Sequence, residues 1–172
     1  MRNIAPILEL LSNSQTNYLA TLDALPADRW MQRPQTDAWS AAEITVHLTM
    51  VEHGVQKAAQ RVLAAPPIEV PFLKRFHLPV SMSSVRLFKA KTPVPVKAER
   101  LGEKPELVAA LTNARQGTVD FLEANREKNL ETYRAPHPLL GMLDLYQWHE
   151  FLAYHQDRHR KQLRAIVDSF HP

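Results

Sequence analysis

Apolar residues recur every three or four positions along four long stretches of the chain, which is the period of an α-helix with one buried face. The first stretch spans residues 3–25 and ends at Pro26. Proline stops a helix there because it lacks an amide hydrogen and its ring clashes with the preceding turn. We therefore predict a first long helix whose apolar positions are Ile4, Ile7, Leu8, Leu11, Leu19, Leu22 and Leu25.

The sequence Ser-Ala-Ala-Glu at residues 40–43 predicts the start of a second helix. The Ser40 hydroxyl can accept the amide hydrogen of Glu43, while the Glu43 carboxylate accepts the amide hydrogen of Ser40. We expect this helix to begin at Ala41 and to stop before the Pro-Pro pair at 66–67. Its expected inward positions are Ile44, His47, Leu48, Val51, Val55, Ala58 and Val62.

Two further helical stretches follow in the second half of the chain. Residues 106–127 keep their apolar positions in helical phase, and Pro105 is tolerated at a helix entry because the first amide hydrogens are unpaired there. Asp144 is a suitable N-cap for a fourth helix that we expect to reach Phe170. The expected inward residues are Leu107, Leu111, Ala114, Thr118, Phe121 and Leu122 of the third helix, and Leu145, Trp148, Leu152, His155, His159, Gln162, Leu163, Ile166 and Phe170 of the fourth.

Residues 66–105 contain seven prolines, too many for a long helix or a central strand. We interpret this segment as a long crossover with short helical turns around Phe-Leu-Lys-Arg-Phe at 72–76 and Ser-Ser-Val-Arg-Leu-Phe at 83–88. Such a crossover either covers a pocket or serves as a packed connector. Four helices, one long connection and no strand pattern predict an all-α four-helix bundle that forms a single domain over residues 1–172.

The amino-acid composition excludes several kinds of chemistry for this domain. Of its 172 residues 45% are hydrophobic and 23% charged, which is typical of one globular domain, and none is cysteine. The lack of cysteine excludes disulfides, thiolate ligands and a cysteine nucleophile, so any thiol must arrive with a substrate. The first residues lack the continuous apolar run of a signal peptide or a membrane span, and we therefore expect a cytoplasmic location.

The charge is only mildly basic. A net charge of +3 and a sequence pI near 9.3 fall short of the basic surface of a nucleic-acid-binding protein. We interpret the densest basic run, residues 158–164, as the solvated outer face of a helix, with Arg158, Lys161 and Arg164 pointing away from His155. We therefore expect neither a nucleic-acid nor a membrane partner.

Three of the eight histidines, His47, His155 and His159, fall on the apolar stripes of predicted helices. His155 and His159 are four residues apart, so their rings lie about 40° apart around the helix axis and can converge. A single core histidine is best interpreted as a hydrogen-bonded packing residue, but three unpaired imidazoles would be costly to bury. Together they predict a divalent metal site, suited to zinc or nickel, with a coordination position open for water or substrate.

The remaining histidines are not expected to join this site. His149 lies roughly 120° around the helix from His155, which places it at a rim or on the surface, and His53 is displaced from His47 in the same way. His77 and His137 are expected in loops and His171 in the tail, and none has an assigned role.

Two further polar residues lie one turn from the predicted ligands. Glu43 and Gln162 could each orient a ligand from outside, or could act only as a cap or a packing residue. Glu43 is the nearest candidate for a fourth ligand, but the Ser40 cap already uses it.

Three segments of the chain resemble signatures of the DinB-like superfamily. Residues 39–52, Trp-Ser-Ala-Ala-Glu-Ile-Thr-Val-His-Leu-Thr-Met-Val-Glu, are similar to a first signature, a Trp-Ser pair before a helix with one histidine, a leucine and a downstream glutamate. Residues 137–148 and 155–162 are similar to a second signature, a Pro-x-x-Gly entry followed by His-x-x-x-His-x-x-Gln. The residues that match the first signature are Trp39, Ser40, His47, Leu48 and Glu52.

This resemblance implies an up-down-down-up four-helix bundle with a long crossover between helices two and three. It also implies a metal triad at His47, His155 and His159 and, for many members, a homodimer. The superfamily includes YfiT-type metal-dependent hydrolases, thiol transferases that use bacillithiol, mycothiol or glutathione, and a maleylpyruvate isomerase. Substrate specificity would be set in the crossover.

Two classes of function follow. The leading hypothesis is a metal-dependent enzyme that acts on a small molecule, either as a hydrolase or as a transferase of a low-molecular-weight thiol. Its metal would lower the pKa of bound water or hold the thiol as thiolate. The alternative is a non-catalytic bundle whose metal ties helices two and four together, or a module that binds a ligand or partner.

Overall fold

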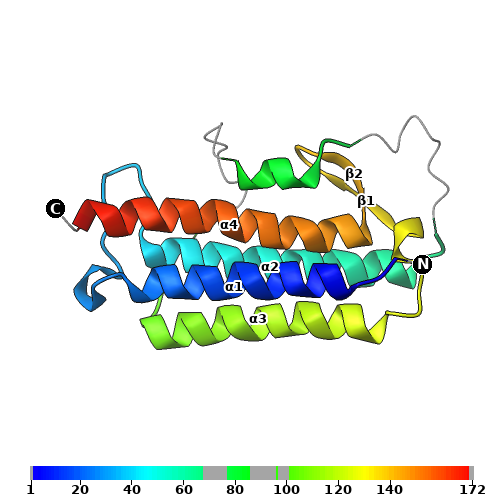
Figure 1. Ribbon diagram of the computed structural model, residues 1–172, viewed down its shortest axis with the longest axis horizontal. Coiled ribbons are helices and arrows are strands. Elements are labelled where there is room, and N and C mark those ends of the chain that lie inside the picture. Colours follow the sequence, from blue (N-terminus) through cyan, green and yellow to red (C-terminus); the bar gives the residue numbers. More distant parts are fainter. Residues whose placement is uncertain (1, 68–76, 86–95, 97–100, 171–172) are drawn as a thin grey trace.

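The computed structural model describes residues 2–67, 77–85, 96 and 101–170, and these residues are predominantly helical (Figure 1). The long helices are α1 (Ala5–Asp23), α2 (Ala41–Ala64), α3 (Lys104–Ala124) and α4 (Leu145–Phe170). Short 3-10 helices cover Ala27–Arg29, Val80–Ser84 (η3) and Leu130–Thr132, and a small antiparallel sheet is formed by β1 (Arg134–His137) and β2 (Gly141–Asp144).

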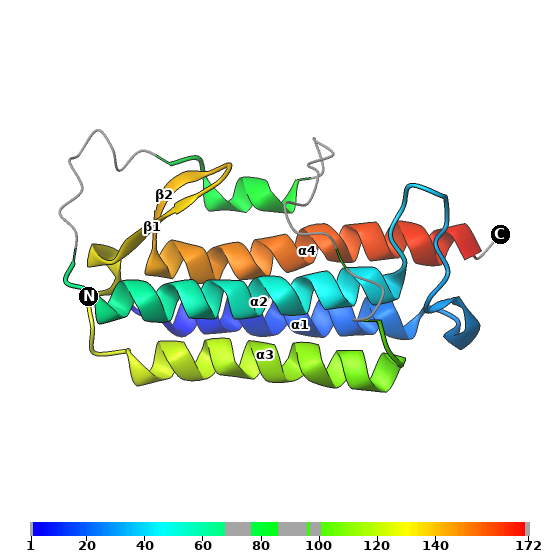
Figure 2. The same cartoon turned by 180° about the vertical axis from the view of Figure 1, so that it is seen from behind.

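The four long helices lie lengthwise beside one another, as both views show (Figures 1 and 2). The colour gradient shows that α1 and α4 run in one direction and α2 and α3 in the other. Helix α4 packs against α1 and α2, and α2 also packs against α3. The expectation of an all-α protein is therefore confirmed in its main feature. None of the helices among the described residues is both long and apolar enough to cross a bilayer.

Two capping boxes set the starts of α2 and α4, where the sequence predicts a box at Ser40 and a cap at Asp144. The Ser40 hydroxyl accepts a hydrogen bond from the Glu43 amide at 3.2 Å, and the Glu43 carboxylate accepts one from the Ser40 amide at 2.8 Å. Asp144 and Gln147 repeat the arrangement, each amide donating to the other side chain at 2.9 Å. Helices α2 and α4 consequently begin at Ala41, as predicted, and at the residue after Asp144.

The other two long helices differ slightly from the predicted ranges. Helix α1 is shorter at both ends than residues 3–25, and α3 is shifted toward the N-terminus relative to residues 106–127. Helix α3 ends early because the Asn125 side chain donates to the Phe121 carbonyl at 2.8 Å and the chain then turns away. These shifts leave the buried faces of both helices in place.

The expectation that the chain has no strand was wrong for residues 134–144. Strand β1 pairs antiparallel with β2, with Arg134 opposite Asp144 and His137 opposite Gly141. Each strand has only four residues, and a proline interrupts β1, so no alternating pattern stands out in the sequence. His137 therefore ends a strand and is not a loop residue.

Residues 77–85 of the crossover are packed against α4 and the hairpin (Figures 1 and 2). The Leu78 amide donates to the Leu140 carbonyl at 2.9 Å, and Val80 packs with Leu140, Leu143 and Phe151. The helical turn expected at 83–88 is present only as the end of η3, at Ser83 and Ser84. Val85 is already extended, and residues 86–88 and the turn expected at 72–76 lie outside the described residues.

Candidate metal centre

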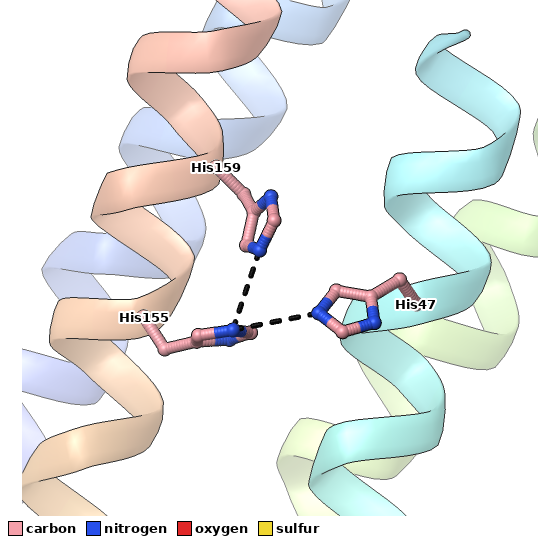
Figure 3. A group of neighbouring side chains, drawn as sticks. All are labelled: His47, His155 and His159. Carbon is pink, nitrogen blue, oxygen red and sulfur yellow. Dashed lines mark hydrogen bonds between the residues drawn. The ribbon is translucent and has the colours of Figure 1, made fainter. Parts of the chain in front are cut away.

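His47 of α2 and His155 and His159 of α4 point toward a common centre between the two helices (Figure 3). The Nε2 atom of His155 lies 3.4 Å from Nε2 of His47 and 3.3 Å from Nε2 of His159. The ligand nitrogens of all three residues fall within 4.8 Å of one another. The structure thus brings together the three histidines that the sequence singles out.

Local features of the sequence explain this meeting. His155 and His159 share one side of α4 because they are one helical turn apart. The capping box at Ser40 fixes the start of α2, and with it the height at which His47 faces α4. The direct packing of α2 on α4 then closes the distance between the rings.

Two of the three nitrogen separations fit a tetrahedral metal ion. Two nitrogens bound to one zinc ion at 2.0–2.1 Å lie roughly 3.3 Å apart when the geometry is tetrahedral. The two Nε2 separations of 3.3 and 3.4 Å match this value. Gln162 accepts at Oε1 from Nδ1 of His159 at 3.0 Å, which places the proton on Nδ1 and makes Nε2 the nitrogen that can bind a cation.

The surroundings keep the imidazoles of His47 and His155 neutral, the form that binds a metal. Burial lowers the pKa of His47 to about 4. The pKa of His155 is well below its usual range because of burial and because His159, His47 and Arg158 add positive charge nearby. Both residues therefore offer neutral nitrogens at pH 7.

Two aromatic side chains border the histidines. The Trp39 ring stacks over His159 with a centroid separation of 6.1 Å and lies 5.0 Å from the His47 ring. The Phe151 ring lies 5.1 Å from His155, one turn earlier on α4. An apolar wall on either side lowers the local dielectric and strengthens electrostatic interactions within the site.

The family follows from a comparison with known proteins. The model of the DinB superfamily matches residues 10–163. The chain belongs to the DinB superfamily. The uncharacterized protein YuaE of Bacillus subtilis (strain 168) is 26% identical over 149 residues, which cover 86% of this chain and 88% of that protein. No solved structure gave a significant match to the chain.

In this DinB superfamily chain the two candidate orienting residues play different roles. Gln162 contacts His159, as described above. Glu43 instead caps α2 and is paired with Arg33, whose Nε donates to Oε2 of Glu43 at 2.9 Å. Of the two alternatives that the sequence leaves open for Glu43, its contacts are those of a cap.

The prediction that His149 lies at a rim or on the surface was wrong. His149 is fully buried, with its ring stacked on Phe121 of α3 at 5.3 Å and its Nδ1 bonded to the Leu145 carbonyl. Helix α4 is covered on several sides, so a position far around the axis from His155 is still inside the protein. His149 stands apart from the triad, as predicted, and His53 is exposed.

The basic run on α4 is only partly a solvated face. Lys161 and Arg164 are exposed, but Arg158 is half-buried and donates to the Val85 carbonyl. Lys161 also donates to the Ser84 carbonyl at 3.2 Å. These bonds hold the end of the described crossover against α4, one helical turn from the histidines, which the charge pattern alone did not indicate.

Proposed function

We propose that this member of the DinB superfamily is a metal-dependent enzyme whose divalent ion is held by His47, His155 and His159. The observation that carries the proposal is the separation of 3.3 and 3.4 Å between the Nε2 atoms. Imidazole ligands suit zinc, nickel, copper and iron, and of these we propose zinc or nickel as the resident metal.

The family and the helix directions support a finer assignment of the fold. We propose an up-down-down-up four-helix bundle that forms one domain over residues 1–172. The opposite directions of the α1/α4 and α2/α3 pairs, together with the long connection between α2 and α3, support this topology.

Three histidine ligands would leave a coordination position of the metal open for a reactant. Among the described residues, the group of potential ligands contains three histidines and no carboxylate. A divalent ion with three imidazole ligands supplies Lewis acidity, which lowers the pKa of a coordinated water or thiol toward neutrality. Gln162 holds the proton of His159 on Nδ1, while Trp39 and Phe151 border the histidines with apolar surface.

We propose a small-molecule substrate and either hydrolysis or transfer of a low-molecular-weight thiol. The chain contains no cysteine, so a reacting thiol must come from the substrate. A homodimer, a cytoplasmic location and the lack of nucleic-acid and membrane partners stay predictions.

The decisive experiment identifies the bound metal and tests whether it has an open coordination position. Protein purified without a histidine tag is analysed for bound metals, and cobalt-substituted protein is titrated with small thiols and hydroxamates. The proposal expects one divalent ion per chain and a change in the visible cobalt spectrum on titration. A buried ion with no spectral response would instead support the non-catalytic alternative, in which the metal only ties α2 to α4.

A further inference from the structure

A buried polar network joins all four long helices beside the metal centre. Its centre is Arg115 of α3, which is 5% exposed, and its other charged member is Glu52 of α2, which is 2% exposed. Gln156 of α4, 1% exposed, and Ser14 of α1 complete it. Burial of a charge is costly unless the charge is paired and hydrogen-bonded, and the contacts of Arg115 and Glu52 offset this cost.

The guanidinium of Arg115 reaches three helices at once. Its Nε donates to Oε1 of Glu52 at 2.8 Å, and its Nη2 donates to Oε1 of Gln156 at 2.9 Å. Its Nη1 donates to the Leu11 carbonyl at 2.8 Å and to the Ser14 hydroxyl at 3.1 Å. Because a guanidinium is planar and rigid, these bonds fix the positions of α1, α2 and α4 relative to α3.

The partners of Arg115 are themselves held by further bonds. Thr118 donates to the second carboxylate oxygen of Glu52 at 2.5 Å, and Ser14 donates to Oε1 of Gln156 at 2.9 Å. Neither α2 nor α4 can therefore slide along its axis without breaking several buried hydrogen bonds of Glu52 or Gln156.

Two members of this network lie close in sequence to the proposed metal ligands, one on α2 and one on α4. Gln156 follows His155 directly on α4, and Glu52 lies five residues after His47 on α2. The histidines face each other across α2 and α4, whereas Glu52 and Gln156 both reach Arg115 on α3. The network thus joins α2 to α4 by a second route, independent of the imidazoles.

We propose that Arg115, with Glu52 and Gln156, positions the metal ligands by fixing the height of α2 against α4. The Nε2 separations of 3.3 and 3.4 Å require a fixed height of α2 against α4, and the bonds of Arg115 to both helices fix that height. A site that is already in place binds its ion more tightly because no ordering of the helices remains to be done. This inference rests on the proposed metal site.

The test compares metal affinity with fold stability in full-length protein. Gln156→Met removes the acceptor for Arg115 and Ser14 but keeps the size of the side chain. We expect its affinity for cobalt, measured by competition with a chromophoric chelator, to fall at least about tenfold, the effect usual for residues that hold metal ligands. Its visible cobalt spectrum is expected to change as well. Gln156→Glu, which keeps an oxygen acceptor at this site, should restore most of the affinity.

A matched control separates positioning from a general loss of stability. Leu152→Ala truncates a buried side chain on the same helix, outside the network, and should lower stability while leaving cobalt affinity within about threefold of wild type. The double variant Glu52→Met/Arg115→Met replaces the buried ion pair with apolar groups, which often preserves stability. We expect this double variant to bind cobalt more weakly than wild type even if its free energy of unfolding is unchanged.

The outcomes separate this inference from the proposed function. Wild-type affinity and spectrum in Gln156→Met and in the double variant would overturn the positioning role while leaving the metal site intact. Equal losses in Leu152→Ala and Gln156→Met would overturn it too, because stability alone would then account for the effect. If wild-type protein binds no divalent ion, the proposed function and this inference both fail.

Discussion

Gln162 lies one turn after His159 on α4, and its side-chain oxygen is 3.0 Å from Nδ1 of that histidine. This contact holds the proton on Nδ1 and turns Nε2 toward His155 and His47. Gln162, which lies on the same face of α4 as His155 and His159, thus has a specific role. It orients a ligand.

Gln162→Leu should therefore weaken metal binding without removing it. The Nδ1 proton of His159 would lose its acceptor, and a loss of about 10- to 100-fold in affinity is expected for such a residue. Isothermal titration of metal-free protein with zinc measures the change. Gln162→Glu keeps an acceptor and serves as the control; if both variants bind zinc like wild type, Gln162 has no orienting role.

Replacing any one of the triad should abolish stoichiometric metal binding. His47→Ala, His155→Ala and His159→Ala each leave two imidazoles, too few for a stable site in this chain. His149→Ala is the matched control, because it removes a buried histidine from the same helix and should lower stability by about 1–3 kcal/mol while keeping the metal. Metal analysis after dialysis distinguishes the variants. If His149→Ala loses the metal while the three triad variants keep it, the assignment of His47, His155 and His159 as ligands is wrong.

The Ser40–Glu43 box should affect the fold more than the metal. Ser40→Ala removes the acceptor for the Glu43 amide and is expected to cost about 1 kcal/mol of stability. Glu43→Gln weakens the ion pair with Arg33, yet it should leave the stoichiometry of metal binding unchanged, since Glu43 is engaged in the cap. Urea unfolding and metal analysis on both variants check this. A metal-free Glu43→Gln protein would show that the carboxylate is a ligand after all.

Acid should destabilise the metal-free protein over a defined range. Burial lowers the pKa of His149 to about 4 from an ordinary value of 6.5, and the pKa of His47 is lowered to the same extent. Between these two pH values the unfolded chain binds protons that the folded chain does not. The free energy of unfolding should therefore be level above pH 6.5 and fall toward pH 4, by up to about 1.4 kcal/mol per pH unit for each histidine.

Chemical unfolding at several pH values measures this slope. His149→Phe keeps a ring against Phe121 but cannot titrate, and its slope should be smaller by up to one proton. An unchanged slope would mean that His149 is not held neutral in the folded protein. In the metal-loaded protein, the same acid range should release the ion, because protonated imidazole cannot bind it.

The sequence predicts the parts of this protein that depend on local signals. Ser40 and Asp144 predict the first turns of α2 and α4 because each cap is formed with a residue only three positions away. The phases of His47, His155 and His159 follow directly from those helices, so the triad could be identified before any tertiary contact was known.

The features that were missed depend on what surrounds each helix. Periodicity identifies one buried face, but α4 is covered on several sides, and His149 is buried by Phe121 of another helix. The sequence marks Glu52 only through its match to the family signature and does not single out Arg115, because their buried ion pair joins residues 63 positions apart. The hairpin was missed because its strands are short and β1 contains Pro136.

The attachment of the crossover to α4 bears on how this site can diversify. Arg158 and Lys161 hold Val85 and Ser84 through main-chain carbonyl oxygens, which every amino acid possesses. Residues 84 and 85 can therefore be exchanged for others without losing the anchor, whereas the two basic side chains cannot. Substitutions at residues 84 and 85 can change the side chains near the three histidines while the crossover keeps the same attachment to α4.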